Sequence, residues 1–430
     1  MVASLAHKLW RHFQDDSLFR NSFFLMMATA VMSGFGFVFW LIWTKFFTPA
    51  DIGVSSSLMS MVGIVSSLSV LGFNNSLIRY LPTASTPGRI FRSAVTLTVS
   101  LSFVVALVAL MVLRFANPSL SFVTKSPLIA VAFVIFSIFG TLSIVLENTF
   151  IALRSSEKVF IKNSIFSIIK LVLPIFFIGF AAFGLFAAIS LSTVCACIYG
   201  FASLRRQAGY LSYRPLIDRA AMRPMLAFSL SNYVVSVFSG FPSLVLPIII
   251  TNRLGAASAG YYYIDFLIAT LLFVIPSATS NSFLAEGSQA SSNLRMHALS
   301  ALKISYALML PAIVVTYFLS PYLLAFFGKS YAGGGTELLR LLAVSGIFIV
   351  YNGLAGSYLN LKQLVGKLMV VSILGVACVL VATYVLASYG LVGIGCGWLI
   401  GQILISVLYT IAMAPSLLRD LRTPQTNAAA

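Results

Sequence analysis

The sequence predicts an all-α polytopic membrane protein, with about twelve membrane-spanning helices arranged as two six-helix bundles. Hydrophobic residues make up 60% of the 430-residue chain and charged residues only 9%, whereas a soluble domain averages about 25% charged residues. The mean hydropathy is +1.00. Apolar runs of about 18 residues or more recur from one end of the chain to the other, as membrane-spanning helices require. Short segments of alternating polarity, which a membrane β-barrel requires, do not recur.

Each predicted span is a long apolar run between more polar segments. The first run is too long for a cleaved signal peptide and lacks a small-residue cleavage site, so it is expected to remain as a helix. Before it, residues 1–21 mix basic and aromatic residues, a pattern typical of an interfacial helix or of a frayed basic terminus. The spans are predicted at roughly 22–46, 53–78, 90–114, 128–152, 159–182, 184–203, 225–251, 259–283, 298–319, 336–360, 367–387 and 389–414.

The two bundles are predicted from an internal repeat. The ten residues Thr44–Gly53, TKFFTPADIG, are echoed by Thr251–Gly260, TNRLGAASAG, and each stretch forms a short loop between two apolar runs. Other landmarks recur in the same order about half a chain apart, among them Phe183-Gly184-Leu185 and Tyr389-Gly390-Leu391. Several matches in one register indicate a duplicated unit.

The repeat divides the chain into two lobes of six spans each. The N-terminal lobe is predicted at residues 22–203 and the C-terminal lobe at 225–414, joined by a basic cytoplasmic linker at 204–224 and followed by a cytoplasmic tail at 415–430. Because each lobe has an even number of spans, both lobes have the same orientation. We therefore expect a pseudo-twofold axis along the membrane normal, with a substrate path between the lobes near the midplane.

The net charge of +17 reports topology and does not indicate a nucleic-acid site. On the predicted topology, 20 of the 27 basic residues lie on the same side as the N-terminus, and six lie on the opposite side. This asymmetry follows the positive-inside rule and predicts a multi-pass protein of the cell membrane with both termini in the cytoplasm.

Ionisable residues at membrane depth are candidate functional residues, because burying a charge in a bilayer is costly. Lys170 falls near the middle of the fifth span and could hold a phosphate as a compact point charge, or could form a salt bridge with Glu147 on the preceding span. Asp265 follows three tyrosines in the eighth span. Asp265 and Glu147 are the candidate coupling acids, and a satisfied polar group at a helix interface is the alternative for Asp265.

Four arginine and lysine residues near span ends complete the candidate substrate-binding set. Lys45 and Arg253 occupy similar positions in the two repeats, and each could instead extend to the membrane interface. Arg340 could be occupied by an i,i+3 pair with Glu337. Arg79 is expected to close the second span.

Candidate hinges lie at matching depths of the first and seventh spans. Gly34 and Gly36 weaken the first span, and Pro242 and Pro247 weaken the seventh. Proline removes a backbone hydrogen bond, which must be replaced by a neighbouring helix or by a water-lined cavity. The alternative is that these residues reflect only the general frequency of glycine and proline in membrane helices.

Enzyme chemistry and metal binding find no support in the sequence. The three histidines fall in terminal or loop stretches, and no paired-acid, zinc-protease, nucleophile-elbow or phosphate-loop motif occurs. The four cysteines fall within predicted spans and lack the spacing of a metal site. We therefore expect no catalytic residues, no metal and no cofactor, apart from coupling to a proton or sodium gradient.

Five stretches carry a family resemblance: Leu18-Phe19-Arg20-Asn21, Pro49–Gly53, Leu71–Pro82, Phe327–Tyr331 and Tyr389–Gly395. They resemble the Wzx-type flippases of lipid-linked oligosaccharides, in the multidrug/oligosaccharidyl-lipid/polysaccharide (MOP) exporter superfamily. The resemblance covers almost the whole chain through the order of its spans and loops. It implies a MATE-like fold of two six-helix bundles around a cationic cleft lined by spans 1, 2, 7 and 8.

The resemblance also implies alternating-access transport of an isoprenoid-pyrophosphate-linked glycan for O-antigen, capsule or exopolysaccharide assembly. A polysaccharide polymerase and glycosyltransferases would be its partners, together with the bilayer and the lipid-linked substrate. The first two spans lack the acid that the multidrug exporters of the superfamily carry there. Lipid II flippases are similar but usually have two additional spans.

Two other functions stay open at this point. An ion-coupled exporter of small amphiphilic compounds could use the same scaffold. A polytopic glycan polymerase or ligase would need acidic residues in a large outer loop, which the sequence lacks.

Overall fold

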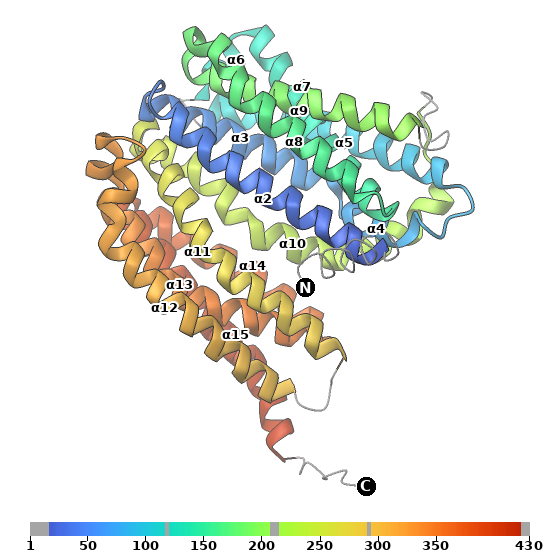
Figure 1. The fold of residues 1–430 in the computed structure, drawn as a ribbon, viewed down its shortest axis with the longest axis vertical. Coiled ribbons are helices and arrows are strands. Elements are labelled where there is room, and N and C mark those ends of the chain that lie inside the picture. The colour runs from blue at the N-terminus through green and yellow to red at the C-terminus, as the bar shows by residue number, and fades with distance from the viewer. Residues whose placement is uncertain (1–16, 117–119, 207–214, 290–293, 423–430) are drawn as a thin grey trace, which may run out of the picture. The chain divides into compact units, whose positions relative to one another are not determined.

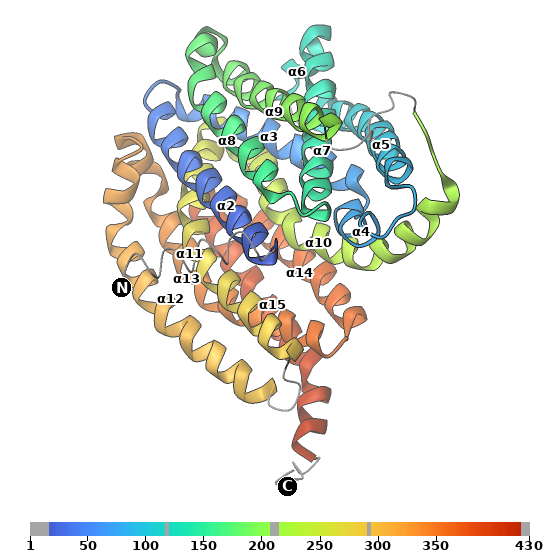
Figure 2. The ribbon, with the colours of Figure 1, turned by 45° about the vertical axis from the view of Figure 1, so that its right-hand side comes forward.

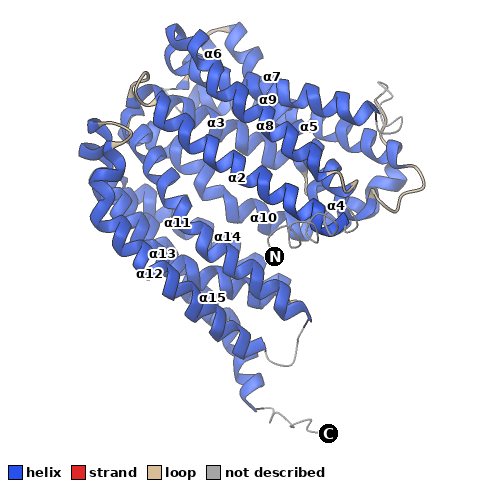
Figure 3. Ribbon diagram, viewed as in Figure 1, coloured by secondary structure: helices blue, strands red, loops and turns tan. Residues whose placement is uncertain are grey.

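The computed structural model describes residues 17–116, 120–206, 215–289 and 294–422. Within these ranges the regular structure is helical throughout, as Figure 3 shows by colour. The first predicted segment, 1–21, and the predicted linker and tail fall partly outside the described residues. The main helices (Figure 1) are α2 Ser17–Trp43, α3 Pro49–Val70, α4 Phe73–Tyr80, α5 Pro87–Ala116, α6 Phe122–Lys125, α7 Pro127–Ala152, α8 Ser156–Val172, α9 Ala181–Arg206, α10 Arg219–Leu254, α11 Ala256–Gln289, α12 Leu294–Ala325, α13 Lys329–Leu361, α14 Val365–Leu386 and α15 Gly390–Arg422.

The helices correspond in order to the predicted spans, and the predicted fold class is confirmed. Ten stretches of the described chain are long and apolar enough to cross a bilayer. Two of them, Ser156–Arg205 and Val365–Pro415, contain 50 and 51 residues, more than twice the roughly 20 residues that one crossing needs. Each of these two stretches folds back on itself: α8 packs on α9, and α14 packs on α15. Each therefore supplies two of the predicted spans.

The second predicted span, 53–78, is wrong at its C-terminal end. Helix α3 ends at Val70, because Leu71 and Gly72 both adopt left-handed backbone conformations, with φ of 49° and 74°. The separate helix α4 follows and packs on α7. Arg79 therefore lies on a short helix of eight residues, and not at the end of the span.

The chain forms two compact units, and two helices contribute to both. The first unit comprises Met1–Tyr233 and Ser243–Gly260, and the second comprises Val234–Pro242 and Tyr261–Ala430. The middle stretch of α10, Val234–Pro242, thus belongs to the second unit while both ends of the helix belong to the first, and the first turn of α11 belongs to the first unit. The lobe boundaries expected from the repeat stay a prediction, because they rest on span order, which carries no information on which turns pack together.

A close contact in the first unit relates the two copies of the ten-residue repeat. A Cβ atom added to Gly53 on α3 would collide with the Ala256 carbonyl and lie 2.7 Å from the Gly260 nitrogen. A Cβ added to Gly260 on α11 would collide with the Pro49 carbonyl and lie 2.8 Å from its carbon. The two contacts exchange equivalent residues of the repeat, as a twofold axis requires. The sequence repeat is therefore also a structural one.

The N-terminus of α3 explains part of the first copy of this repeat. Thr48 is the N-cap, and its hydroxyl accepts a hydrogen bond from the Asp51 amide at 3.2 Å. In return, the Asp51 carboxylate accepts one from the Thr48 amide at 3.1 Å. This capping box satisfies amides that a helix start leaves without partners. Asp51 is therefore a structural acid.

The second pair of landmarks has a different register from the predicted one. A Cβ on Gly184 would collide with the Phe177 carbonyl and lie 3.0 Å from the Phe180 Cβ. A Cβ on Gly393 would meet the Leu386 carbonyl and the Tyr389 Cβ in the same way. Gly184 therefore corresponds to Gly393, and not to Gly390 as its flanking residues suggest. The likeness of Phe183-Gly184-Leu185 to Tyr389-Gly390-Leu391 is therefore a coincidence, because the structural equivalent of Gly184 lies three positions after Gly390.

Candidate functional site

Lys170 lies buried near the C-terminal end of α8, with a side chain only 8% exposed. Its ammonium is 5.1 Å from the ring centre of Phe39 on α2 and 4.9 Å from that of Phe166. Helices α2 and α8 pack side by side, as both ribbon views show (Figures 1 and 2). Cation–π attraction to two rings stabilises a charge in such surroundings without neutralising it. In the described part of the chain, no carboxylate pairs with Lys170.

A proline disrupts the helix immediately after Lys170. Pro174 has no amide hydrogen, so the carbonyl of Lys170 loses its usual helical donor. From Leu173 to Phe180 the chain continues as a 3₁₀ helix. The Trp43 indole on α2 donates to the neighbouring Leu171 carbonyl at 3.2 Å. The end of α8 thus places a buried cation beside backbone carbonyls that lack the regular helical pattern.

The predicted alternative, a salt bridge between Lys170 and Glu147, is not present. Glu147 instead pairs with Lys162, at 3.2 Å between its Oε2 and the lysine Nζ. Lys162 is 3% exposed and also donates to the Ser143 hydroxyl at 3.0 Å. This pair lies two helical turns before Lys170 on α8. Glu147 is therefore occupied by a structural ion pair, and its charge does not compensate Lys170.

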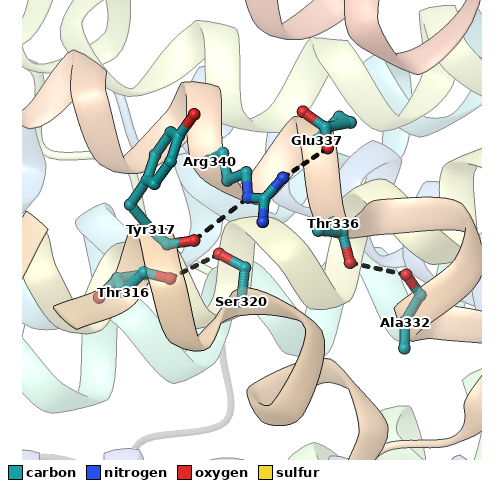
Figure 4. A network of polar contacts seen from close by, with 7 residues as sticks. All are labelled: Thr316, Tyr317, Ser320, Ala332, Thr336, Glu337 and Arg340. Atoms are coloured by element: carbon teal, nitrogen blue, oxygen red, sulfur yellow. Dashed lines mark hydrogen bonds and ion pairs between the residues drawn. The ribbon is translucent and has the colours of Figure 1, made fainter. Parts of the chain in front are cut away.

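Three of the outer and terminal cations are exposed, and the fourth is paired. Lys45, Arg79 and Arg253 are exposed side chains. Arg340 on α13 donates to the Glu337 carboxylate at 2.7 Å and to the Tyr317 carbonyl at 3.2 Å, and it covers the Tyr317 ring. Figure 4 shows this network between α12 and α13.

Arg340 therefore follows the structural alternative, a pair with Glu337. Within the first unit, Lys170 is the buried member of the predicted set, and a shared substrate site for the five cations stays a prediction.

Asp265 is fully buried on α11 in the second unit. Within the described residues, neither of its carboxylate oxygens has a hydrogen-bond partner. A Cβ added to Gly335 on α13 would lie 2.6 Å from Asp265 Oδ2, and one added to Gly334 would lie 2.7 Å from the Tyr261 ring. The consecutive glycines of α13 thus make room for this acid and its neighbour. A buried carboxylate without a partner is costly, and a coupling role for Asp265 stays a prediction.

The four predicted hinge positions lie in continuous helices. Helix α2 runs through Gly34 and Gly36, and α10 runs through Pro242 and Pro247. A Cβ at Gly34 or Gly36 would meet no other atom within 4 Å, so close packing does not require a glycine at either position. A role as hinges stays a prediction.

A pocket in the second unit was not predicted from the sequence. It has a volume of about 580 Å³, and its lining comes from α10, α11, α13, α14 and α15. Its polar members include Ser280, Asn352 and Gln402. Isolated amides and hydroxyls in apolar runs give no periodic signal. The nearest sequence signal is Pro276, a proline within the apolar run of α11 that lines this pocket.

The two units therefore offer different chemistry. The first holds a buried ammonium, and the second holds a buried acid and an uncharged polar pocket. None of these groups forms a nucleophile and base pair with the geometry of a hydrolase.

The fold is shared with solved transporter structures. An inward-facing multidrug resistance MATE family transporter of the MOP superfamily is 16% identical, with a TM-score of 0.70 over 93% of this chain and 99% of that one. The lipid II flippase MurJ in an inward closed conformation is 13% identical, with a TM-score of 0.72 over 91% of this chain and 87% of that one. A MOP superfamily transporter from Pyrococcus furiosus is 14% identical, with a TM-score of 0.61 over 95% and 96%.

These likenesses establish the MOP-type fold that the sequence motifs imply. No curated protein matches the chain significantly. A family model described as "Polysaccharide biosynthesis protein" matches residues 18–283, which is more than half of the chain. The protein therefore belongs to the polysaccharide biosynthesis protein family.

Proposed function

We propose that the protein is a flippase for an isoprenoid-pyrophosphate-linked oligosaccharide. It moves this lipid from the cytoplasmic to the outer leaflet of the cell membrane by alternating access, during assembly of a surface polysaccharide such as O-antigen, capsule or exopolysaccharide. Membership in the polysaccharide biosynthesis family supports the glycan. The fold supports transport, because transporters and a flippase share it.

The buried ammonium of Lys170 is the observation that carries the proposal. A cation at membrane depth is costly and is retained where a partner or a function requires it. The aromatic rings of Phe39 and Phe166 stabilise this charge, and no described carboxylate cancels it. A pyrophosphate is the part of the proposed substrate that most needs such a counter-charge. Its contact with an ammonium is strengthened by the low dielectric constant of the surroundings.

The remaining cations have secondary roles in this proposal. Exposed Lys45, Arg79 and Arg253 attract anionic headgroups toward the ends of the helices over about a Debye length. Arg340 contributes less, because Glu337 already neutralises it. A polymerase and glycosyltransferases that act on the same glycan are the expected partners.

Asp265 supports a second candidate function, an ion-coupled exporter of small amphiphilic compounds. Its buried and unpartnered carboxylate could bind a proton or a sodium ion in one state of the transport cycle. The same acid could also couple glycolipid movement to an ion gradient. In this proposal, Asp265 is the residue that tests the energy source of transport, and Lys170 is the residue that tests the charge of the substrate.

The test is the sidedness of lipid-linked glycan in cells that lack the protein. Intact cells and inside-out vesicles are treated with a glycosidase that cannot cross the membrane, and the lipid-linked glycan is quantified by mass spectrometry. The flippase account predicts that the glycan accumulates at the cytoplasmic face and that the intact gene restores it to the outer face. Normal outward-facing glycan, together with increased sensitivity to amphiphilic drugs, would support the exporter instead.

A further inference from the structure

The pocket of the second unit is large, lined by five helices and free of charged side chains among the described residues that line it. Its volume of about 580 Å³ is in the range of small-molecule binding sites. All its lining residues belong to the second unit. The chemistry of this lining therefore differs from that around Lys170, and it is suited to a different part of a ligand.

A chain of hydrogen bonds fixes the orientation of the amide groups in this pocket. The Ser406 hydroxyl donates to the Asn352 Oδ1 at 2.8 Å. The Asn352 amide nitrogen in turn donates to the Gln402 Oε1 at 3.0 Å and to its backbone carbonyl at 3.2 Å. Because the Gln402 oxygen is the acceptor, the Gln402 amide nitrogen keeps its two hydrogens for another acceptor. No acceptor for that nitrogen occurs among the described residues.

A buried hydroxyl adds a second unused group from α11. Ser280 is 8% exposed and lines the pocket. Its hydroxyl has no hydrogen-bond partner in the described chain. A Cβ at Gly353 would lie 2.7 Å from this hydroxyl, so the glycine makes room for it. The hydroxyl is covered in this conformation, so a ligand would reach it only after rotation about the Ser280 Cα–Cβ bond to another staggered rotamer. A hydrogen bond to the ligand would then remove the free-energy cost of an unused buried hydroxyl.

Trp398 gives the pocket an aromatic surface. Its indole nitrogen already donates to the Ser345 hydroxyl at 3.0 Å, and Phe266 packs against its ring edge-to-face at 5.4 Å between centres. The indole is thereby fixed, and what it offers to a ligand is apolar ring surface and not a donor.

We propose that this pocket binds an uncharged sugar residue of the translocated glycan. A sugar presents hydroxyls, which both donate and accept, beside an apolar face of C–H groups. The Gln402 amide, the Ser280 hydroxyl and the Trp398 ring match these three features. The inference rests on the proposed function and deepens it, because it assigns a recognition site for the glycan to the second unit.

Other occupants match the lining less well. An isoprenoid tail would leave the Gln402 and Ser280 groups without partners, at a cost of roughly 1–3 kcal/mol for each group. A metal cation would find no carboxylate among the described lining residues. A second phosphate or an acidic sugar would find no ammonium or guanidinium there.

The test measures how much a neutral sugar adds to binding. Three synthetic ten-carbon isoprenyl lipids serve as probes: the pyrophosphate alone, the pyrophosphate bearing an N-acetylhexosamine disaccharide, and the same disaccharide with one uronic acid. Their dissociation constants are measured on the purified full-length protein in a detergent without sugar. The variants are Ser280→Ala and Gln402→Leu. Thr410→Val, which removes a hydroxyl of α15 outside the pocket lining, is the matched control.

The wild-type protein and Thr410→Val should bind the neutral glycolipid at least about tenfold more tightly than the bare pyrophosphate. Each pocket variant should bind the neutral glycolipid about three- to tenfold more weakly than the wild type does, as expected for the loss of one hydrogen bond. Its affinity for the bare pyrophosphate lipid should be unchanged. Ser280→Ala removes an unused buried hydroxyl, so its folding should be unimpaired.

Any of three results would overturn the inference while leaving the flippase account intact. The first is a sugar that adds nothing to binding of the pyrophosphate lipid. The second is a gain in affinity that survives in both pocket variants, and the third is an equal gain for the acidic sugar. If no pyrophosphate lipid binds the wild-type protein, the proposed function fails and the inference fails with it.

Discussion

Replacing Lys170 by Met separates the function of this side chain from its structural contribution. Methionine has a similar length and keeps favourable contacts with Phe39 and Phe166, since its sulfur packs well against aromatic rings. The change loses two cation–π contacts of order 1 kcal/mol each. It also removes the cost of holding a charge away from water. These effects oppose each other, so the thermal stability of the variant should stay close to that of the wild type.

The effect on transport should be much larger. An ammonium and a phosphate charge about 4 Å apart attract by about 4 kcal/mol at an effective dielectric constant of 20. A charged hydrogen bond measured by mutation contributes about 1.5–3 kcal/mol. Because each 1.4 kcal/mol is a factor of ten, Lys170→Met should slow translocation by between about tenfold and a thousandfold.

The assay reconstitutes each variant in liposomes that contain a fluorescent isoprenyl-pyrophosphate oligosaccharide. An impermeant reagent quenches the outward-facing label, and the quenching time course gives the translocation rate. Lys170→Arg, which keeps the charge, should recover part of the rate. The exposed Lys303, changed to Met, controls for a general loss of positive charge. A Lys170→Met rate above half that of the wild type would refute the assignment.

Three further variants test the structural account. Lys162→Met leaves the Glu147 carboxylate without its partner and should lower the melting temperature of the purified protein, and an unchanged melting temperature would show that the pair is dispensable. Gly53→Ala forces a methyl group onto the Ala256 carbonyl and should destabilise the protein by roughly 1–3 kcal/mol in thermal unfolding. The control is Gly34→Ala, where the added methyl group meets nothing, and equal effects at both positions would contradict the close contact. Asp265→Asn should keep glycolipid binding but weaken the acceleration of transport by a proton or sodium gradient, whereas full gradient dependence in the variant would exclude Asp265 as the coupling acid.

The sequence was sufficient for the fold class because the bilayer imposes a strong pattern. An apolar run must be long enough to cross, and it must satisfy its own backbone, so span number and order follow directly from hydropathy. The same pattern is blind to local backbone conformation. Hydropathy predicted one span across α3 and α4, because neither Leu71 nor Gly72 interrupts the apolar run. The positive φ values of these two residues nevertheless end the helix there.

The site was predictable residue by residue but not pair by pair. Lys170 was identified because a lysine in an apolar run is rare and costly. Its surroundings could not be predicted. Glu147 pairs with Lys162 rather than with Lys170 because of the register in which α7 packs on α8. The distance between Arg340 and Glu337 is fixed within one helix, which is why that pair could be anticipated.

The pocket of the second unit shows a further limit. Asn352 and Gln402 are uncharged residues on two helices 50 positions apart, and each is unremarkable in its own apolar run. They become a site only because α13 and α15 pack together. The direction of the hydrogen-bond chain, which leaves one amide group unused, is visible only in three dimensions.

The most direct test of the account is whether transport requires the pyrophosphate. In the reconstituted liposomes, the translocation rate of the isoprenyl-pyrophosphate oligosaccharide is compared with that of the same oligosaccharide joined to the same isoprenoid by an uncharged ether. The account predicts rapid, protein-dependent movement of the pyrophosphate lipid, sensitive to Lys170→Met, and little movement of the uncharged one. Equal rates for both lipids, or no protein-dependent movement of the pyrophosphate lipid, would contradict it.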